Sequence, residues 1–145
     1  PDLAIPGSSK LDVIEKDDAK KMLEDFEPKG RLHSIWTLNT PYIVGICNCD
    51  TQECQPIRCD LSWGTTSCFK SEYFATTDYD KCSGCLECRS LCSFGAIKYS
   101  PHYEKCTVDL IKCTGCGICR SVCPEDAISL RVRTEHPVAK NLWKF

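Results

Sequence analysis

Cysteine is the residue that most constrains how this chain can fold, because it occupies 14 of the 145 positions. Eight of these cysteines fall into two copies of the pattern C-x-x-C-x-x-C-x-x-x-C, which lie 31 residues apart. Between residues 79–100 and 110–131, ten of the 22 aligned positions are identical. A repeat this regular predicts two copies of one structural unit side by side. The copies contain Cys82, Cys85, Cys88 and Cys92, and then Cys113, Cys116, Cys119 and Cys123.

The spacing within each copy favours a cubic [4Fe–4S] cluster over other uses of cysteine. Three thiolates at steps of three wrap a tight loop around one face of the cluster, and Gly84 and Gly115 let the backbone turn close to it. The fourth cysteine falls one helical turn further on and faces the neighbouring cluster. Zinc prefers two separated ligand pairs, and C-x-x-C on a tight loop suits structural disulfides poorly. We expect crossed ligand sets: Cys82, Cys85, Cys88 with Cys123, and Cys113, Cys116, Cys119 with Cys92.

Residues 79–132 resemble the bacterial two-[4Fe–4S] ferredoxins on these motifs. The resemblance implies an α+β, ferredoxin-type dicluster fold with a pseudo-twofold repeat, preceded by a small α+β Cys-rich region. The chain departs from the family pattern at Ser93, where the second copy has the usual proline, Pro124. Serine restores a backbone N–H and adds a hydroxyl, and donors near sulfur stabilise a reduced cluster. We therefore predict that the cluster next to Ser93 is the less reducing of the two.

The first half of the chain reads as one helix followed by strands. Residues 17–27 place Ala19, Met22, Leu23 and Phe26 on one helical face, with Asp17 as the predicted N-cap and that face expected in the core. Leu32–Leu38 and Tyr42–Cys49 are strand-like and predict a hairpin across residues 39–41. Glu72–Thr76 predicts a further strand that leads into the repeat.

Five more cysteines in this half predict a third metal site. Cys47 and Cys49 point to the same side of an extended chain, and residues 50–53 can turn Cys54 back towards them. Cys59 or Cys68 is then available as the fourth ligand. Ile46–Asp50, with Cys54 and Arg58, also resembles a segment upstream of paired cluster motifs in iron–sulfur proteins of anaerobes. A third iron–sulfur cluster, a structural zinc site and unliganded thiols all remain open here, and the isolated Cys106 is expected to be a small buried hydrophobe.

Composition narrows the classes of function. The formal net charge of −2, with no block of Lys or Arg, argues against nucleic acid as a partner. No apolar run reaches the length of a membrane span, and residues 1–10 lack the features of a signal peptide, so we expect no membrane insertion. Oxygen-labile clusters and reduced cysteines predict the cytoplasm of an anaerobic or facultative organism.

The predicted organisation is an N-terminal region at residues 1–77, a cluster domain at 78–132 and a docking tail at 133–145. No catalytic residues are predicted. We expect electron transport through two [4Fe–4S] clusters, as an iron–sulfur subunit of a larger anaerobic oxidoreductase with its other subunits or a redox protein as partner. The alternatives are a free ferredoxin-like carrier, or an enzyme that binds substrate at an incompletely ligated third cluster at Cys47, Cys49 and Cys54.

Overall fold

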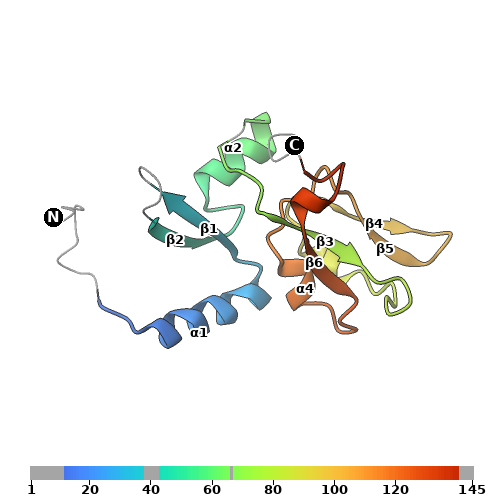
Figure 1. Cartoon of the computed structure of the whole chain (residues 1–145), viewed down its shortest axis with the longest axis horizontal. Helices are drawn as coiled ribbons and strands as arrows, with labels where there is room; N and C mark the ends of the chain where they lie inside the picture. The colour runs from blue at the N-terminus through green and yellow to red at the C-terminus, as the bar shows by residue number, and fades with distance from the viewer. Residues whose placement is uncertain (1–11, 38–42, 66, 141–145) are drawn as a thin grey trace.

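The computed structural model describes residues 12–37, 43–65 and 67–140, and their mixture of helices and antiparallel sheets confirms the α+β class (Figure 1). Three two-stranded sheets pair β1 with β2, β3 with β6, and β4 with β5. The helices and 3₁₀ turns are α1 (Lys16–Phe26), η2 (Glu27–Lys29), α2 (Gln55–Trp63), α3 (Glu87–Ser90), α4 (Ile118–Ser121) and η3 (Arg133–Glu135). The strands are β1 (Leu32–Thr37), β2 (Ile43–Cys49), β3 (Tyr73–Thr77), β4 (Ile97–Ser100), β5 (Lys105–Val108) and β6 (Ile128–Val132).

The predicted N-terminal hairpin is confirmed by the antiparallel pairing of β1 with β2. Leu32 is opposite Cys49 and Ser34 is opposite Cys47, so both cysteines lie on one face of the hairpin. The predicted connection at residues 39–41 lies outside the described residues. The hairpin therefore presents two thiols side by side at the end of β2.

Helix α1 is present where the apolar periodicity predicts it, but two details of the prediction are wrong. Glu15 is the N-cap, and Asp17 lies in the first turn, where its charge faces the positive end of the helix dipole. No residue of α1 is buried, and Met22 is 46% exposed. The helix runs along the edge of the molecule (Figure 1), and the other residues of its apolar face, Ala19, Leu23 and Phe26, are half-buried.

Helix α2 is an element that hydrophobic periodicity did not reveal. It begins directly after Cys54, carries Pro56 in its first turn and ends at Gly64, whose φ of 65° is left-handed. Asp60 then orders the chain beyond the helix, because its carboxylate accepts backbone N–H bonds from Ser67 and Cys68 at 2.6 and 3.0 Å. Helix α2 thus determines where Cys68 lies.

The second half contains equivalent elements at an offset of 31 residues. Helix α3 corresponds to α4, strand β4 to β6, and strand β5 to residues 74–77 of β3. The predicted strand before the repeat is confirmed one residue later, as β3, and it pairs with β6 across the molecule. Strand β5 pairs with β4 in the same way. Because β3 completes the second sheet, it packs with the elements of the cluster domain although the predicted boundary at residue 77 lies after it.

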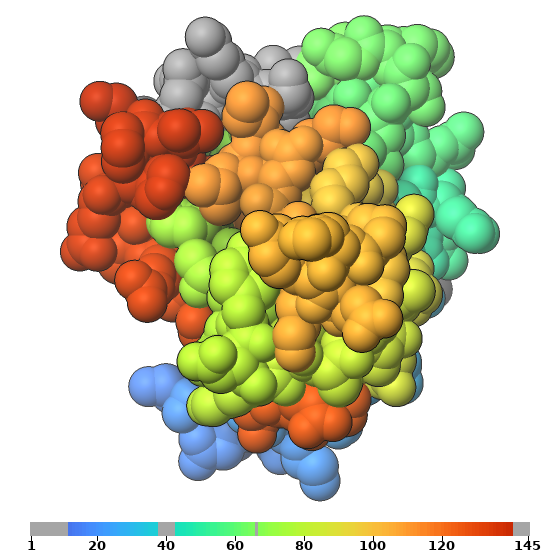
Figure 2. Space-filling view, turned by 90° about the vertical axis from the view of Figure 1, so that its right-hand side faces the viewer, coloured from blue at the N-terminus to red at the C-terminus, as the bar shows by residue number. Residues whose placement is uncertain are grey.

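Cysteine and small side chains dominate the core of the second half. The buried cluster contains Phe74, Ala75, Cys82, Cys88, Ala96, Ile97, Cys106, Cys113, Ala127, Ile128 and Ala139. In the space-filling view the folded chain forms one body, with α1 at its lower edge and α2 at its upper edge (Figure 2). Among the described residues, none of the helices has the length and apolar character needed to cross a bilayer.

Candidate metal centres

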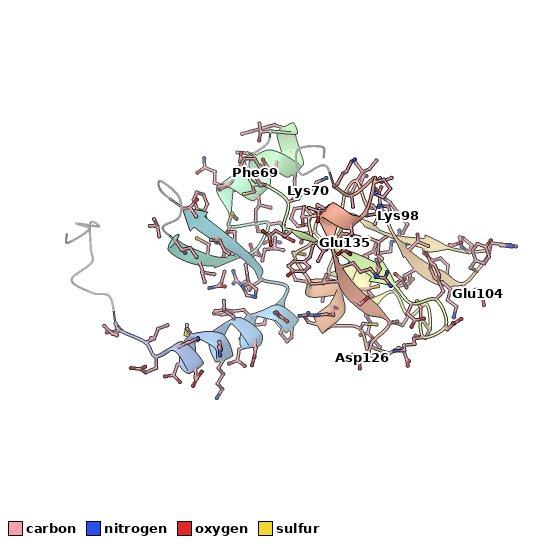
Figure 3. The ribbon with its side chains drawn as sticks, viewed as in Figure 1. Phe69, Lys70, Lys98, Glu104, Asp126 and Glu135 are labelled. Atoms are coloured by element: carbon pink, nitrogen blue, oxygen red, sulfur yellow. The ribbon has the colours of Figure 1, made fainter. Side chains whose placement is uncertain are left out.

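The two cysteine loops lie so close to neighbouring backbone that only glycine fits at one position in each. Gly84 and Gly115 have φ values of 74° and 80°. A Cβ on Gly84 would lie 2.3 Å from the carbonyl oxygen of Glu104, at the outer end of the β4–β5 hairpin (Figure 3). A Cβ on Gly115 would lie 2.1 Å from the carbonyl oxygen of Tyr73. The first loop is therefore held tightly against the end of the β4–β5 hairpin, and the second loop is held tightly against β3.

One cavity brings together the four cysteines of the second predicted ligand set. It has about 360 Å³ of empty space, part of which is open to solvent. The cysteines that line it are Cys92, Cys113, Cys116 and Cys119. Leu91, Phe94 and Ile118 complete the wall on the side of the N-terminal region. The fourth cysteine of the first motif thus lies beside the first three cysteines of the second motif.

A second cavity brings together the reciprocal set. It has about 300 Å³ of empty space and is lined by Cys82, Cys85, Cys88 and Cys123. Cys106 also lines it and is only 2% exposed. Cys106 is buried, as the sequence predicted, but its place beside the motif cysteines was not foreseen. The repeat held a signal for this place. Cys106 lies 31 residues after Ala75, so the two residues occupy the same position in their copies of the repeat.

Backbone amides point at four of the cysteine sulfurs in two equivalent pairs. The N–H groups of Cys106 and Ala75 donate to the sulfurs of Cys82 and Cys113, both at 3.5 Å. The N–H groups of Ala96 and Ala127 donate to the sulfurs of Cys92 and Cys123, at 3.2 and 3.3 Å. Such donors stabilise negative charge on sulfur, which is what a thiolate ligand requires.

Burial controls the protonation of the cysteines when no metal is bound. It raises the pKa of Cys88 to about 12, with the nearby thiols of Cys106, Cys119 and Cys123 adding to the effect. It also raises the pKa of Cys119 to about 12, with Cys116, Cys113 and Cys92 contributing. Without a metal, Cys88 and Cys119 are therefore neutral thiols at pH 7, and binding of a metal to them would release their protons.

The N-terminal cysteines are only partly brought together. Cys54 is 6% exposed, and the half-buried Cys49 and Cys68 pack against the same apolar cluster. Burial raises the pKa of Cys49, and the thiols of Cys54 and Cys47 raise it further. Burial raises the pKa of Cys68, with Asp60 and Cys54 adding to it. Neither Cys47 on β2 nor Cys59 on α2 is among the cysteines of this cluster in the described residues.

The turn that returns Cys54 towards Cys49 is well defined. The Asp50 carboxylate accepts backbone N–H bonds from Gln52 and Glu53, both at 2.8 Å. The Cys54 N–H donates to the Asp50 carbonyl at 3.0 Å, and Arg31 forms ion pairs with Asp50 and Glu53 at 3.3 and 2.5 Å. The predicted reversal over residues 50–53 is therefore confirmed.

The repeat cysteines fit iron–sulfur clusters by their donor chemistry and by their surroundings. Each cavity offers four motif thiols, amide donors to sulfur and a glycine turn that a side chain would block. In the part of the chain that the structure describes, no three His, Cys, Asp or Glu side chains converge on the position of a single ion. Ligands of a cubic cluster are held apart by the width of the cube, so they need not converge in that way.

A comparison with protein families gives the same interpretation for the second half. The family model described as 4Fe-4S dicluster domain matches residues 81–127. No curated protein matches the chain. The matched range holds both cysteine motifs, and with them all eight motif cysteines that line the two cavities. The chain therefore contains, at residues 81–127, an iron–sulfur domain of the ferredoxin type.

Proposed function

We propose that this protein carries electrons between other redox proteins, as the iron–sulfur subunit of a larger oxidoreductase. The single observation that carries the proposal is the pair of cavities, each lined by four motif cysteines, three from one motif and one from the other. A [4Fe–4S] cluster, when bound, accepts and releases one electron with little change in geometry. We assign Cys82, Cys85, Cys88 and Cys123 to one cluster and Cys113, Cys116, Cys119 and Cys92 to the other.

The chain's own contribution to electron transfer is position, shielding and charge. Crossed ligands would fix the two sites at a constant separation, because α3 and α4 are part of the same packed body. The side chains of Ile97, Ile118 and Ile128 are buried beside the cavities and exclude water from them. Complete coordination by cysteine leaves no open position for a substrate, so these two sites are suited to carrying electrons and not to catalysis.

The surface supports a subunit over a free carrier. Residues 79–132 contain seven Lys or Arg and six Asp or Glu, so the polypeptide lacks the acidic shell that would steer a diffusing carrier. The N-terminal region exposes large apolar side chains, including Ile35 at 64%, Ile43 at 61% and Trp63 at 77%. Exposed apolar surface of this kind is typical of a protein that docks on a partner. The reducing cytoplasm of an anaerobic or facultative organism would keep such sites intact.

The test of this proposal is anaerobic isolation of the chain from its natural source. Native mass spectrometry is expected to find it bound to another polypeptide, and dithionite is expected to produce EPR signals of reduced clusters. A one-electron acceptor should then abolish those signals without any other substrate. A stable monomer would support the free carrier instead, and a loaded protein that takes up no electrons would exclude both.

We further propose that Cys47, Cys49, Cys54 and Cys68 bind a third metal, with Cys68 and not Cys59 as the fourth ligand. The support is the shared packing of Cys49, Cys54 and Cys68 against the Leu32–Ile57–Ile118 cluster, and the place of Cys47 on the same face of β2 as Cys49. Because no three of the described side chains converge on one ion position, a cluster is favoured here over a single zinc ion. With four cysteine ligands no coordination position would be open, so this site is proposed as structural or electron-carrying and not as a substrate site.

Metal analysis of two alanine variants tests the third site. Cys68→Ala is expected to lose the third metal, because it removes a ligand that no other side chain replaces. Cys59→Ala is the matched control and should retain it. About eight irons and one zinc per chain identify a zinc site, and about twelve irons identify a third cluster. Eight irons without zinc in the unmodified protein would contradict the proposal.

A further inference from the structure

The first cysteine of each motif accepts a hydrogen bond from a cationic side chain on its backbone carbonyl. Lys105 donates to the Cys82 carbonyl at 2.5 Å. Arg133 donates from Nη2 to the Cys113 carbonyl at 3.0 Å. The two cavities therefore each have one cation at an equivalent place, although the cations come from different positions of the repeat.

The two cations differ greatly in burial. Lys105 is half-buried, whereas Arg133 is 1% exposed and is one of the largest fully buried side chains. The other hydrogen bonds of Arg133 go to the carbonyls of Ser71, Ala139 and Tyr73, at 2.8, 3.1 and 2.6 Å. These acceptors are neutral, and in the described residues the hydrogen bonds of Arg133 include none to a carboxylate. Arginine stays charged in proteins, so its full positive charge lies in the core beside Cys113.

A second buried cation lies on the same side. Lys70 is 4% exposed, and its ammonium donates to the carbonyl of Ile111, two residues before Cys113. Burial lowers the pKa of Lys70, Arg133 lowers it further, and Cys113 and Asp109 oppose the shift. Figure 3 places Lys70 on the segment between α2 and β3, well away from Glu104 at the far end of the β4–β5 hairpin. In the described residues, the cavity that contains Cys113 thus has two buried cations nearby, Lys70 and Arg133. The cavity that contains Cys82 has one half-buried cation nearby, Lys105.

Burying a positive charge costs free energy, and negative charge nearby lowers that cost. A cluster with four thiolates carries a net negative charge, and taking up one electron makes that charge more negative by one unit. No bond is formed or broken in that step, and the electron comes from the redox partner of the proposed function. In a low-dielectric core, a fixed positive charge favours the more negative state.

We propose that Lys70 and Arg133 make the cluster at Cys113, Cys116, Cys119 and Cys92 the easier of the two to reduce, so that an incoming electron rests there first. This inference rests on the proposed function and adds the order in which the two clusters accept electrons. It has the same direction as the effect expected from Ser93, which follows a ligand of the same cluster. Lys70 and Arg133 act as positioning charges, since neither is a ligand.

The test is a redox titration of the loaded full chain, followed by EPR under anaerobic conditions. Lys70→Met is expected to lower the higher of the two midpoint potentials and leave the other unchanged, so the gap between them narrows. Lys105→Met is the matched control and is expected to lower the lower potential, so the gap widens. Iron content should equal that of the unmodified protein in both variants, because neither residue is a ligand.

Arg133 supplies an independent pair of variants. Arg133→Met should narrow the gap between the two potentials, as Lys70→Met does. Arg133→Lys keeps the positive charge but not the full set of hydrogen bonds, so it should have the same gap as the unmodified protein. If Arg133→Met does not fold, the Lys70 and Lys105 variants still decide the question. The inference would be overturned if fully loaded Lys70→Met kept the same gap between the two midpoint potentials, or if the lower potential of that variant fell. Failure of the proposed function would appear differently, as unmodified protein that takes up no electrons.

Discussion

Replacing Cys123 with alanine is expected to remove the cluster held by the first motif and to spare the cluster held by the second. Cys123 belongs to the second motif in sequence, yet it lines the cavity of Cys82, Cys85 and Cys88. Iron should fall by about four atoms per chain, because one four-iron site loses a ligand. Cys92→Ala is expected to give the same iron content by loss of the other cluster.

Thiol alkylation followed by tryptic digestion distinguishes the two variants. Trypsin cleaves after Lys81, Arg89, Lys112 and Arg120, so it separates the peptide 82–89 from the peptide 113–120. In Cys123→Ala the three cysteines of peptide 82–89 should become reactive while those of 113–120 stay protected. Cys92→Ala should reverse the pattern. Reactive cysteines in peptide 113–120 of Cys123→Ala, with 82–89 still protected, would show that each motif binds its own cluster.

Anaerobic removal of iron is expected to unfold the second half of the chain. Of the buried residues in its core, only Phe74, Ile97 and Ile128 are large apolar side chains, and four are cysteines. Iron removal leaves cavities of about 360 and 300 Å³ of partly open space. Iron removal also takes away the bonds that hold the eight motif cysteines in place, so little remains in this core to offset the conformational entropy of the chain.

Hydrogen exchange is the measurement that localises this loss. The amides of Ala75, Ala96, Cys106 and Ala127 donate to cysteine sulfurs, so they should lose protection most clearly. Protection should return when iron and sulfide are restored. The Cys59→Ala variant, which leaves both cavities intact, is the control and should exchange like the unmodified protein when loaded. Native protection in the iron-free chain would show that packing alone holds the domain.

Much of the cluster domain could be predicted because its determinants are local in sequence. Steps of three between cysteines require a tight loop, and the loop requires glycine at Gly84 and Gly115. Two strand-like segments joined by a short connection predicted the hairpin of β1 and β2 for the same reason. The apolar face of α1 showed the limit of this approach, since periodicity identifies a face but not what covers it. Helix α2 was missed because its nine residues contain a single buried side chain, Ile57.

The sequence by itself determined the class of cofactor, and it predicted the two tight loops and the exchange of fourth cysteines, because all of these follow from spacing over a few residues. The tertiary structure decided which distant groups surround the loops. It placed the amide of Ala75 on the sulfur of Cys113, and it brought Lys70 to a carbonyl 41 residues further along the chain. It also selected Cys68 over Cys59 as the neighbour of Cys54. Such contacts depend on how strands and helices pack across the molecule, and no periodicity in the chain specifies them.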